Sequence, residues 1–301
     1  DLARADAPPP AHLSAHAQFR RMMMTQVMNV AMIGGGFMGK AHAMAYAAMP
    51  MFFWPAPAIP HRKVVVDVTN AAAETARQRF GFDEASSDWR AVIARPDIDV
   101  VDICTPNNVH AEIAIAAAKA GKHIICEKPL ARTVEEARAM AQAVAQAGVI
   151  HMVAFNYRRT PAVALAKKYI DEGRIGRILN FRGTYLQDWS ADENGPLSWR
   201  FQKKIAGSGT VGDIGTHVVD LAHYLVGPIA AVNAMTRTYV KTRPLQQGDR
   251  LLLRAGCDKQ FATCRAKFGN AARFRGFPHM PGDDFVMAYA VKQKKSKGRR
   301  T

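Results

Sequence analysis

The stretch GGGFMGKAH, residues 34–42, decides the fold of this chain. Its glycines at positions 34, 36 and 39 have the spacing G-x-G-x-x-G. The apolar run NVAMI precedes them and an alanine- and methionine-rich segment follows, so the motif is predicted to lie between a strand and a helix. In that setting the first glycine allows a tight turn, the second lets the backbone approach a pyrophosphate, and the third allows close helix–strand packing. The N-terminus of the helix would then offer free N–H groups to the phosphates.

Short apolar runs and longer helix-favouring runs alternate on either side of this motif. Strands are predicted within 29–33, 63–68, 99–104, 122–126 and 149–159, and helices within 39–49, 70–82, 109–121 and 133–148. Thr133 opens the last of these helices, and Gly121 and Gly148 close two of them. Because few residues separate the runs, we predict an α/β fold built on a doubly wound parallel sheet of the Rossmann type with right-handed crossovers.

Asp67 stands at the end of the second predicted strand. An acidic side chain at this place hydrogen-bonds the ribose hydroxyls of the adenosine and repels a 2′-phosphate, which favours NAD over NADP. The separation from the glycines exceeds the usual value of about 20 residues, and we attribute the excess to a Pro- and aromatic-rich insertion at 50–61. The alternative is that Asp67 only caps the helix that follows it.

The chain changes its pattern after the predicted sheet. A helix is predicted over 162–173, an alternating strand over 178–189, and a helix after the glycine-rich stretch that begins at residue 207. This order indicates a second, α+β domain. The predicted organisation is a disordered leader at 1–27, an NAD-binding Rossmann domain at 28–155, a substrate α+β domain at 156–250 and an atypical basic segment at 251–301.

The formal net charge of +16 is concentrated at the C-terminal end. Residues 251–301 carry twelve Lys and Arg against three Asp and Glu, a net of +9. Such a run is more often solvated than specific, so nucleic acid is not the predicted partner. No apolar run approaches the ~18 residues of a membrane helix. The four cysteines form no C-x-x-C pair, so we predict neither a disulfide nor a metal site, and a reducing, cytoplasmic location.

Two further motifs, CTPNNVH at 104–110 and CEKPL at 126–130, follow predicted strands at the edge where open α/β sheets bind ligands. Together with GGGFMGKAH and GSGTVGDIGTHVVDLAHYLVG at 207–227, they resemble the Gfo/Idh/MocA family of NAD(P)-dependent dehydrogenases (glucose–fructose oxidoreductase, inositol dehydrogenase and rhizopine catabolism protein) over roughly residues 28–240. The segments YRRTPAVALAKKYIDEGRIG and YLQDWSADENGPLSWR resemble the branch of that family that oxidises an anhydro-sugar.

The resemblance implies a C-terminal open, mostly antiparallel sheet, a homo-oligomer, and a function for each matching residue. Lys128 would lie near the reacting hydroxyl, Asp213 and His217 would form a catalytic pair, and Glu127 would approach the nicotinamide ribose. The predicted cofactor-binding residues are Gly34, Gly36, Phe37, Met38, Gly39, Asp67, Thr105, Pro106, Asn107, His110, Glu127 and Lys128.

The chemistry of the catalytic residues agrees with this assignment. Asp213 and His217 are four apart, so at a helix start both side chains share one face. A carboxylate can orient an imidazole for proton abstraction near neutral pH, and an ammonium such as Lys128 can stabilise a developing alkoxide. The alternatives are a structural histidine and an ordinary surface lysine. Asp220, one turn beyond His217, could support the imidazole or form an ion pair.

Aromatic and polar side chains around the second domain are the candidates for substrate contacts. A sugar offers C–H faces to a ring and hydroxyls to hydrogen-bonding groups. The predicted substrate-binding residues are Tyr157, Arg158, Gln187, Asp188 and Trp189, with Trp199 and Arg200 as weaker candidates. A Tyr/Trp strand face is otherwise commonly part of a core.

The C-terminal segment departs from the family pattern. It shows little alternation and few acidic residues. We hypothesise that the reading frame shifts near 243–250, which would truncate the antiparallel sheet, weaken activity and put the homo-oligomer in doubt. The alternative is a divergent, shorter sheet. The predicted function is hydride transfer between NAD and a secondary alcohol of a sugar, anhydro-sugar or cyclic polyol; a non-catalytic NAD or sugar sensor on the same fold is the competing hypothesis.

Overall fold

The computed structural model describes residues 26–245. Within that range the chain divides into two compact units. Unit 1 comprises 26–105, 112–127 and 139–152, and unit 2 comprises 106–111, 128–138 and 153–245. The hypothesis of a shifted frame concerns residues that lie almost entirely outside the described part of the chain, as does the predicted basic segment.

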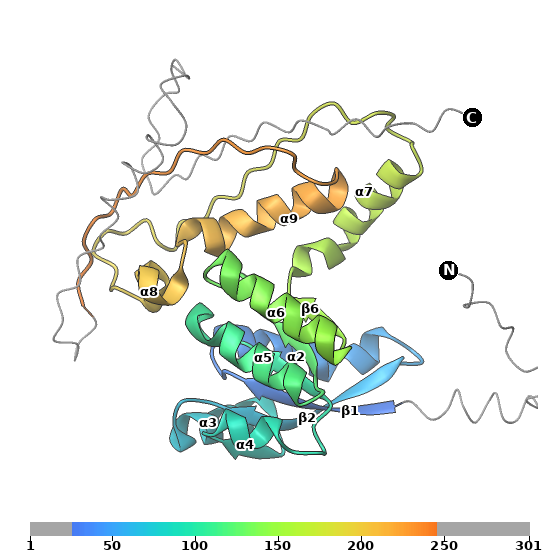
Figure 1. The fold of residues 1–301 in the computed structure, drawn as a ribbon, viewed down its shortest axis with the longest axis vertical. Coiled ribbons are helices and arrows are strands. Elements are labelled where there is room, and N and C mark those ends of the chain that lie inside the picture. Colours follow the sequence, from blue (N-terminus) through green and yellow to red (C-terminus); the bar gives the residue numbers. More distant parts are fainter. Residues whose placement is uncertain (1–25, 246–301) are drawn as a thin grey trace, which may run out of the picture. The chain divides into compact units, whose positions relative to one another are not determined.

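A six-stranded sheet forms the centre of unit 1 (Figure 1). Its strands are β1 (Gln26–Ile33), β2 (Ala58–Val66), β3 (Glu84–Ser86), β4 (Val100–Ile103), β5 (His123–Cys126) and β6 (His151–Val153). Their order is β3-β2-β1-β4-β5-β6, and the pairs β1–β2, β1–β4, β2–β3 and β4–β5 are parallel. This order defines the doubly wound Rossmann sheet, so the predicted fold class is confirmed.

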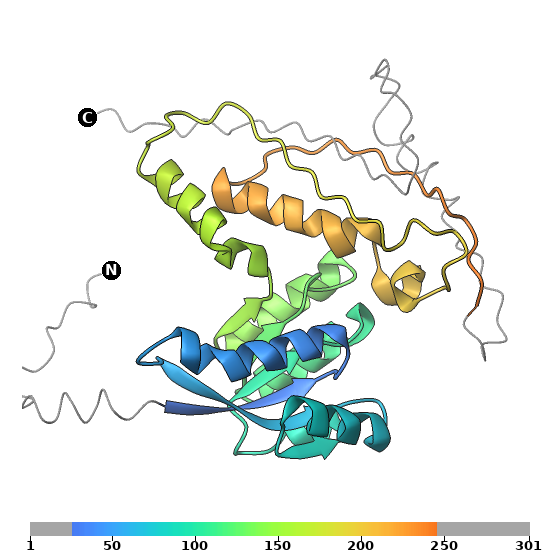
Figure 2. The same ribbon diagram turned by 180° about the vertical axis from the view of Figure 1, so that it is seen from behind.

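Helices connect the strands and cover both faces of the sheet. They are α2 (Phe37–Phe52), α3 (Asn70–Phe80), α4 (Trp89–Ile93), α5 (His110–Lys119) and α6 (Val134–Ala147). Figures 1 and 2 show α2 on one side of the sheet and α5 and α6 on the other. Thr133 caps α6 by accepting a hydrogen bond from the N–H of Glu136, and Gly121 and Gly148 adopt positive φ where α5 and α6 end, as predicted.

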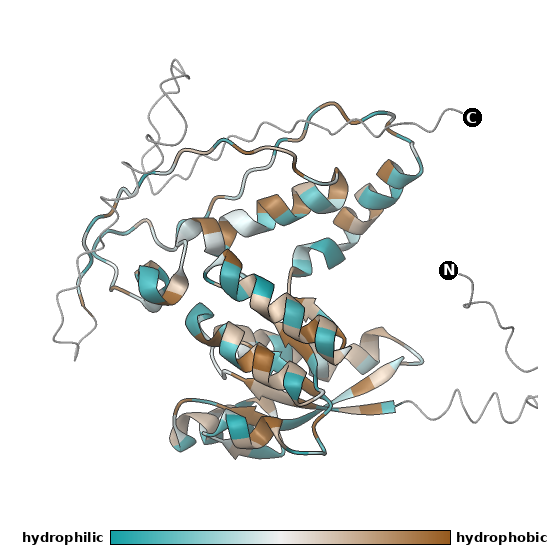
Figure 3. Cartoon of the chain, in the orientation of Figure 1, coloured by the Kyte–Doolittle hydropathy of each residue, from teal (hydrophilic) through white to brown (hydrophobic). Residues whose placement is uncertain are grey.

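The hydrophobic core lies between the strands and these helices. The strands carry the colour of hydrophobic residues and the helices alternate between the two colours in Figure 3. Met32 of β1 and Val65 of β2 are fully buried and pack with Ala43 of α2 and Ala76 of α3. Small alanines on the helices let these pack closely on the branched and thioether side chains of the strands.

The glycine turn after β1 depends on two close approaches. Gly34 has a φ of 104°, and a Cβ there would lie 2.6 Å from the carbonyl oxygen of Cys104. A Cβ on Gly39 would lie 2.1 Å from the carbonyl oxygen of Gly34. Both contacts are with backbone atoms, which cannot move aside, so the first turn of α2 reaches the strand end only with glycine at these positions.

The predicted insertion at 50–61 is much shorter in the structure. Helix α2 continues to Phe52 and β2 begins at Ala58, so only 53–57 remain between them. Strand β2 extends because residues 58–62 pair with β1 over its first half. Strand β3 and helix α4 were not predicted, since elements of three and five residues are too short to show a periodic pattern.

Unit 2 contains the helices that carry the second group of predicted site residues. They are the 3-10 turns η1 (Asn107–Val109), η2 (Asn156–Arg159) and η3 (Trp199–Phe201), the helices α7 (Pro161–Asp171), α8 (Lys203–Ala206) and α9 (Thr216–Leu225), and the π-helical turn η4 (Val211–Gly215). The predicted helices over 162–173 and after Gly207 are confirmed.

The predicted strand at 178–189 is wrong for the described structure. No strand is assigned between residues 154 and 245. An extended segment becomes a strand only when a neighbouring segment pairs with its backbone, and the described residues supply no such pairing for 178–189. Among the described residues, no helix has both the length and the apolar composition needed to cross a bilayer.

Candidate functional site

In unit 1 the glycine turn and Asp67 form one end of the predicted nucleotide site. Gly36 is the N-cap of α2, no side chain caps the helix there, and a Cβ on Gly36 would meet no atom within 4 Å. The helix therefore presents its first N–H groups at an open backbone surface, which suits a pyrophosphate. The side chain of Phe37 is largely exposed and Met38 is half-buried beside this opening.

Asp67 is bound to the glycine turn itself. Its Oδ2 accepts a hydrogen bond from the N–H of Gly35 at 3.0 Å, and its Oδ1 accepts one from the N–H of Val68 at 2.7 Å. The following helix is capped by Thr69, which accepts from the N–H of Ala72. The alternative interpretation of Asp67 as the helix cap is thus wrong, and its carboxylate lies beside the turn where an adenosine ribose is expected in this fold.

The loops after β4 and β5 hold the other predicted cofactor residues. Thr105 is half-buried and Pro106 is exposed. Asn107 is buried and its amide donates to the carbonyl oxygen of Ala206 at 2.9 Å. His110 is fully buried and its Nδ1 donates to the carbonyl oxygen of Pro129 at 3.1 Å. The side chains of Asn107 and His110 therefore connect separate segments of unit 2 through hydrogen bonds. Their contact with a cofactor stays a prediction.

Lys128 and Asp213 meet within unit 2. The Lys128 Nζ donates to Oδ1 of Asp213 at 3.1 Å and to its backbone carbonyl oxygen at 2.7 Å. On the other side, Arg200 Nε lies 4.0 Å from Asp213 Oδ2. Asp213 is on the π-helical turn and Lys128 follows β5, so 85 residues of sequence separate two groups in direct contact. The oxygens of Asp213 therefore hold the ammonium in one position.

His217 lies on α9, one helical turn after Asp213, and is surrounded by aromatic rings. Its imidazole stacks on Tyr157, with ring centroids 4.2 Å apart and 21° between the planes. Phe155 and Tyr185 contact it edge-on, each with centroids 5.9 Å away. The Tyr157 and Tyr185 hydroxyls share a short hydrogen bond. These rings bury the imidazole and fix its orientation.

A pocket in unit 2 opens beside Asp213. The residues that line it are Tyr185, Leu186, Gln187, Trp189, Ser190, Arg200, Phe201, Gly209, Thr210, Asp213 and Ile214. Trp189 stacks on Phe201 and donates from Nε1 to Oε1 of Gln187 at 2.8 Å. Aromatic faces beside amide, guanidinium and carboxylate groups match the surface of a sugar.

The structure brings some of the predicted substrate residues to this pocket and not others. Gln187 and Trp189 line it, and Tyr157 joins it through its hydrogen bond to Tyr185. Asp188 is exposed and is absent from the pocket lining.

Arg158 forms an ion pair with the buried Asp220, its Nε donating to Oδ2 at 2.7 Å. Two alternatives were open for Asp220, support of the His217 imidazole or an ion pair, and the structure shows the ion pair. The exposed side of Arg158 packs over Tyr224. Sequence reasoning missed Tyr185 and Phe201, although Tyr185 shares its alternating face with Gln187 and Trp189.

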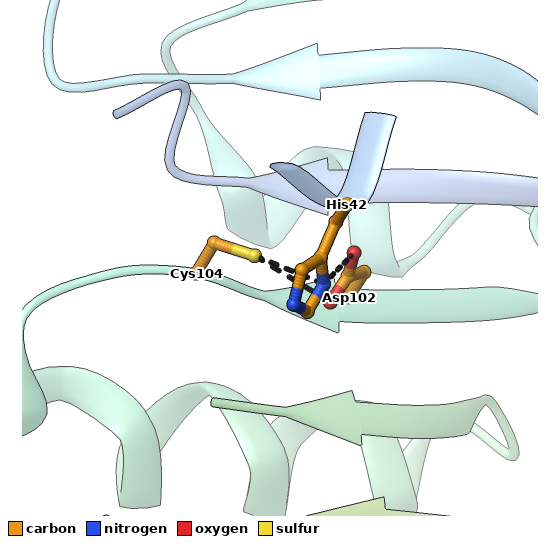
Figure 4. Close-up of side chains that lie close together, drawn as sticks. All are labelled: His42, Asp102 and Cys104. Atoms are coloured by element: carbon orange, nitrogen blue, oxygen red, sulfur yellow. Dashed lines mark hydrogen bonds and ion pairs between the residues drawn. The ribbon is translucent and has the colours of Figure 1, made fainter. Parts of the chain in front are cut away.

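A buried polar cluster in unit 1 was not predicted (Figure 4). His42 of α2 directs Nδ1 at both carboxylate oxygens of Asp102, at 3.0 and 2.9 Å, and Nε2 at Oε1 of Glu127, at 3.0 Å. Tyr46 donates to Asp102 at 2.8 Å, and the Cys104 Sγ lies 3.4 Å from Nδ1. The signal was present in the sequence, because Asp102 interrupts the apolar run VVDIC and a buried carboxylate requires a partner.

The charges of this cluster shift its titration strongly. Burial alone lowers the pKa of His42, but hydrogen bonds with Asp102, Cys104 and Glu127 outweigh burial and raise that pKa well above its ordinary value. Burial and the charge of Asp102 raise the pKa of Cys104 to about 12. His42, Asp102 and Cys104 are close enough together to be considered as metal ligands. Since carboxylates only accept, however, both ring nitrogens of His42 donate and neither has a lone pair for a metal.

A doubly wound sheet with an open glycine turn and an acidic residue after its second strand defines the class of dinucleotide-binding folds. Two family models locate the chain within that class. The Gfo/Idh/MocA oxidoreductase family model for the NAD-binding Rossmann fold matches residues 28–155, and that for the family's C-terminal domain matches residues 163–276. Together they span most of the chain, which therefore belongs to this family and carries its NAD-binding domain.

Among curated proteins, levoglucosan dehydrogenase of Pseudarthrobacter phenanthrenivorans is 70% identical over 223 residues, which are 74% of this chain and 57% of that protein. The scyllo-inositol 2-dehydrogenase (NAD(+)) of Bacillus subtilis is 33% identical over 206 residues, 68% of this chain and 55% of that protein. A solved structure of levoglucosan dehydrogenase with NADH and levoglucosan matches with a TM-score of 0.72 and 70% identity, covering 73% of this chain and 59% of that one. The chain thus spans somewhat over half the length of these relatives.

Proposed function

We propose that this protein is an NAD-dependent dehydrogenase that transfers a hydride between the nicotinamide and a secondary alcohol carbon of a sugar, anhydro-sugar or cyclic polyol. The observation that carries the proposal is the contact of Lys128 with Asp213 beside an aromatic pocket, with His217 one helical turn away. A sensor that only binds NAD or sugar has no need for an ammonium, a carboxylate and an imidazole in one place.

Each of these side chains has a distinct chemical task. The His217 imidazole takes the proton of the substrate hydroxyl as the general base. The Lys128 ammonium stabilises the negative charge that develops on that oxygen, and Asp213 fixes the ammonium through two hydrogen bonds. NAD, when bound, accepts the hydride from the alcohol carbon at its nicotinamide C4, which leaves the carbon as a ketone.

The cofactor preference rests on Asp67. A carboxylate already bound to the N–H of Gly35 stands where a ribose hydroxyl can donate to it, and its charge opposes the 2′-phosphate of NADP. The open helix start at Gly36 accommodates the pyrophosphate. The residues that would hold NAD are therefore the glycine turn, Asp67 and the loops after β4 and β5.

An anhydro-sugar is the first choice of substrate, and an inositol or aldose is the second. The first choice rests on the identity of 70% with levoglucosan dehydrogenase, and the second on scyllo-inositol 2-dehydrogenase. The aromatic stack of Trp189 on Phe201 suits the C–H face of any of these rings. The homo-oligomer and the cytoplasmic location stay predictions.

The direct test is a screen of the full chain with NAD and NADP against anhydro-sugars, inositols and aldoses, followed by the absorbance of reduced nicotinamide. We expect reduction of NAD with levoglucosan, and loss of that reduction in His217→Asn. An NAD complex detected by fluorescence without turnover of any substrate would favour the sensor, or the impaired enzyme that a shifted frame implies.

A further inference from the structure

His42 and Asp102 take no part in the chemistry proposed above, although they belong to a buried cluster of charged side chains in unit 1. Helix α2 supplies His42 and Tyr46, four residues apart on one face, β4 supplies Asp102, and Glu127 follows β5. The side chain of Asp102 is fully buried, and that of Glu127 is 6% exposed. Two carboxylates in one buried place require a cation between them.

We propose that His42 is a positioning residue for the cofactor: its doubly protonated ring holds the Glu127 carboxylate in the orientation that the nicotinamide ribose requires. The inference rests on the proposed function, because Glu127 is a predicted NAD contact. His42 acts only through Glu127 and is not a catalytic residue.

The hydrogen bonds determine the protonation of the ring. The atoms nearest to Nδ1 are the two oxygens of Asp102, with the Cys104 Sγ farther away at 3.4 Å, and the atom that faces Nε2 is an oxygen of Glu127. An ionised carboxylate has no proton to donate, so each nitrogen must donate its own. The imidazolium then offsets one of the two negative charges, and the strong rise in the pKa of His42 has the same cause.

The same bonds form a chain that ends at Glu127. The Tyr46 hydroxyl fixes Asp102, both oxygens of Asp102 fix Nδ1, and Nε2 fixes one oxygen of Glu127. The backbone N–H of Glu127 donates to the carbonyl oxygen of Ile103 at 2.9 Å, so the main chain is held by the sheet. The bond from His42 restricts the torsions of the Glu127 side chain.

Two isosteric substitutions separate positioning from simple structural support. The amide nitrogen of glutamine can take the place of Nε2 and donate to Glu127, whereas that of asparagine can take the place of Nδ1 and donate to Asp102. The full-length wild type, His42→Gln and His42→Asn would be titrated with NADH and followed by nicotinamide fluorescence, with thermal unfolding measured in parallel.

We expect the Kd for NADH to rise about tenfold in His42→Asn and about threefold or less in His42→Gln. Each variant loses one of the two sets of hydrogen bonds that His42 makes. If His42 had a merely structural role, NADH binding would therefore weaken equally in the two variants. The single variant Glu127→Gln should match His42→Asn, and combining the two should add little further loss. The nitrogen NMR signals of the wild-type ring should show both nitrogens protonated from pH 6 to 9.

Equal NADH affinities for His42→Asn and His42→Gln, when the wild type binds NADH, would overturn this inference alone. A His42 ring that titrates near neutral pH, or a stoichiometric metal that the wild type retains and His42→Asn loses, would do the same. A wild-type chain that fails to bind NADH would overturn both this inference and the proposed function. If His42→Asn does not fold, the comparison of Glu127→Gln with the wild type and the NMR signals still decides.

Discussion

Among single residues, Lys128 carries the strongest functional expectation. Its ammonium is held by two oxygens of Asp213, so replacing it by alanine removes a positioned charge. We expect Lys128→Ala to lower kcat by about 10²–10³ and to change the Kd for NADH by less than about threefold, as measured by steady-state kinetics and fluorescence titration. Lys168→Ala, on the exposed face of α7, is the matched control. Full turnover in Lys128→Ala would remove the assignment of this residue.

Asp67 is the residue that we propose sets the choice between NAD and NADP. Removing its carboxylate takes away the acceptor for a ribose hydroxyl and the charge that repels a 2′-phosphate. We expect Asp67→Ala to weaken NAD binding about tenfold and to improve the affinity for NADP relative to NAD. Calorimetric titration of both cofactors measures the ratio, with Asp171→Ala as the control, since Asp171 pairs only locally with Lys167. An unchanged ratio would show that Asp67 serves the glycine turn alone.

Some residues of the site can be predicted from the sequence and others cannot. Gly34, Asp67, Lys128 and Asp213 belong to motifs whose local spacing carries their chemistry, and the structure gives each a matching environment. The partners of His42 could not be read in this way. They come from three elements joined only by the fold, so no local pattern connects them.

At the scale of elements, the turn between β1 and α2 contains two glycines, Gly36 and Gly39, at which alanine should have different effects on stability. An alanine Cβ at Gly39 would lie 2.1 Å from a backbone oxygen, whereas at Gly36 it would meet nothing within 4 Å. We expect Gly39→Ala to destabilise the chain by several kcal/mol, about 3 or more, because neither backbone can yield. Gly36→Ala should fold like the wild type, since its φ of −73° is open to any residue.

Differential scanning calorimetry and NADH titration on the same samples separate the two effects. Gly36→Ala is expected to keep its melting temperature and lose NADH affinity, because a methyl group would stand where the pyrophosphate approaches the backbone. Equal melting temperatures for both variants would contradict the packing described for this turn.

The elements that sequence reasoning placed correctly are those with long local patterns or clear caps, such as α3, α6 and α7. Prediction from the sequence failed where an element depends on backbone pairing with a segment that is distant in the sequence. Residues 178–189 alternate like a strand and yet have no partner among the described residues, while β2 lengthens because β1 pairs with it. Alternation of apolar and polar residues indicates which side chains would share a face if the segment were a strand. Whether the segment becomes a strand depends on a neighbouring segment that can hydrogen-bond with its backbone.

For the molecule as a whole, the cluster at His42 predicts a dependence of stability on pH. The folded pKa of His42 lies well above the value near 6.5 expected in the unfolded chain. Its contribution to the free energy of unfolding is therefore fully present below about pH 6.5 and is lost as the pH rises toward the folded pKa. Between pH 7 and 9 the loss approaches at most about 1.4 kcal/mol per pH unit.

Urea unfolding of the wild type and His42→Asn at several pH values tests this. Groups that titrate in both proteins cancel in the difference between them, so the stability advantage of the wild type should shrink steadily from pH 7 to 9. An advantage that stays constant over that range would mean that His42 is not held as a cation.

The two compact units are each assembled from pieces of chain that are not contiguous, and this limits how the protein can be divided. Residues 106–111 and 128–138 belong to unit 2 although they are encoded between strands of the sheet. A gene fragment beginning at residue 153 would therefore lack Lys128, which binds Asp213, and Asn107, which donates to the carbonyl oxygen of Ala206. The C-terminal half cannot be transplanted onto another nucleotide-binding domain as an independent cassette unless the recipient also brings its own loops after the fourth and fifth strands.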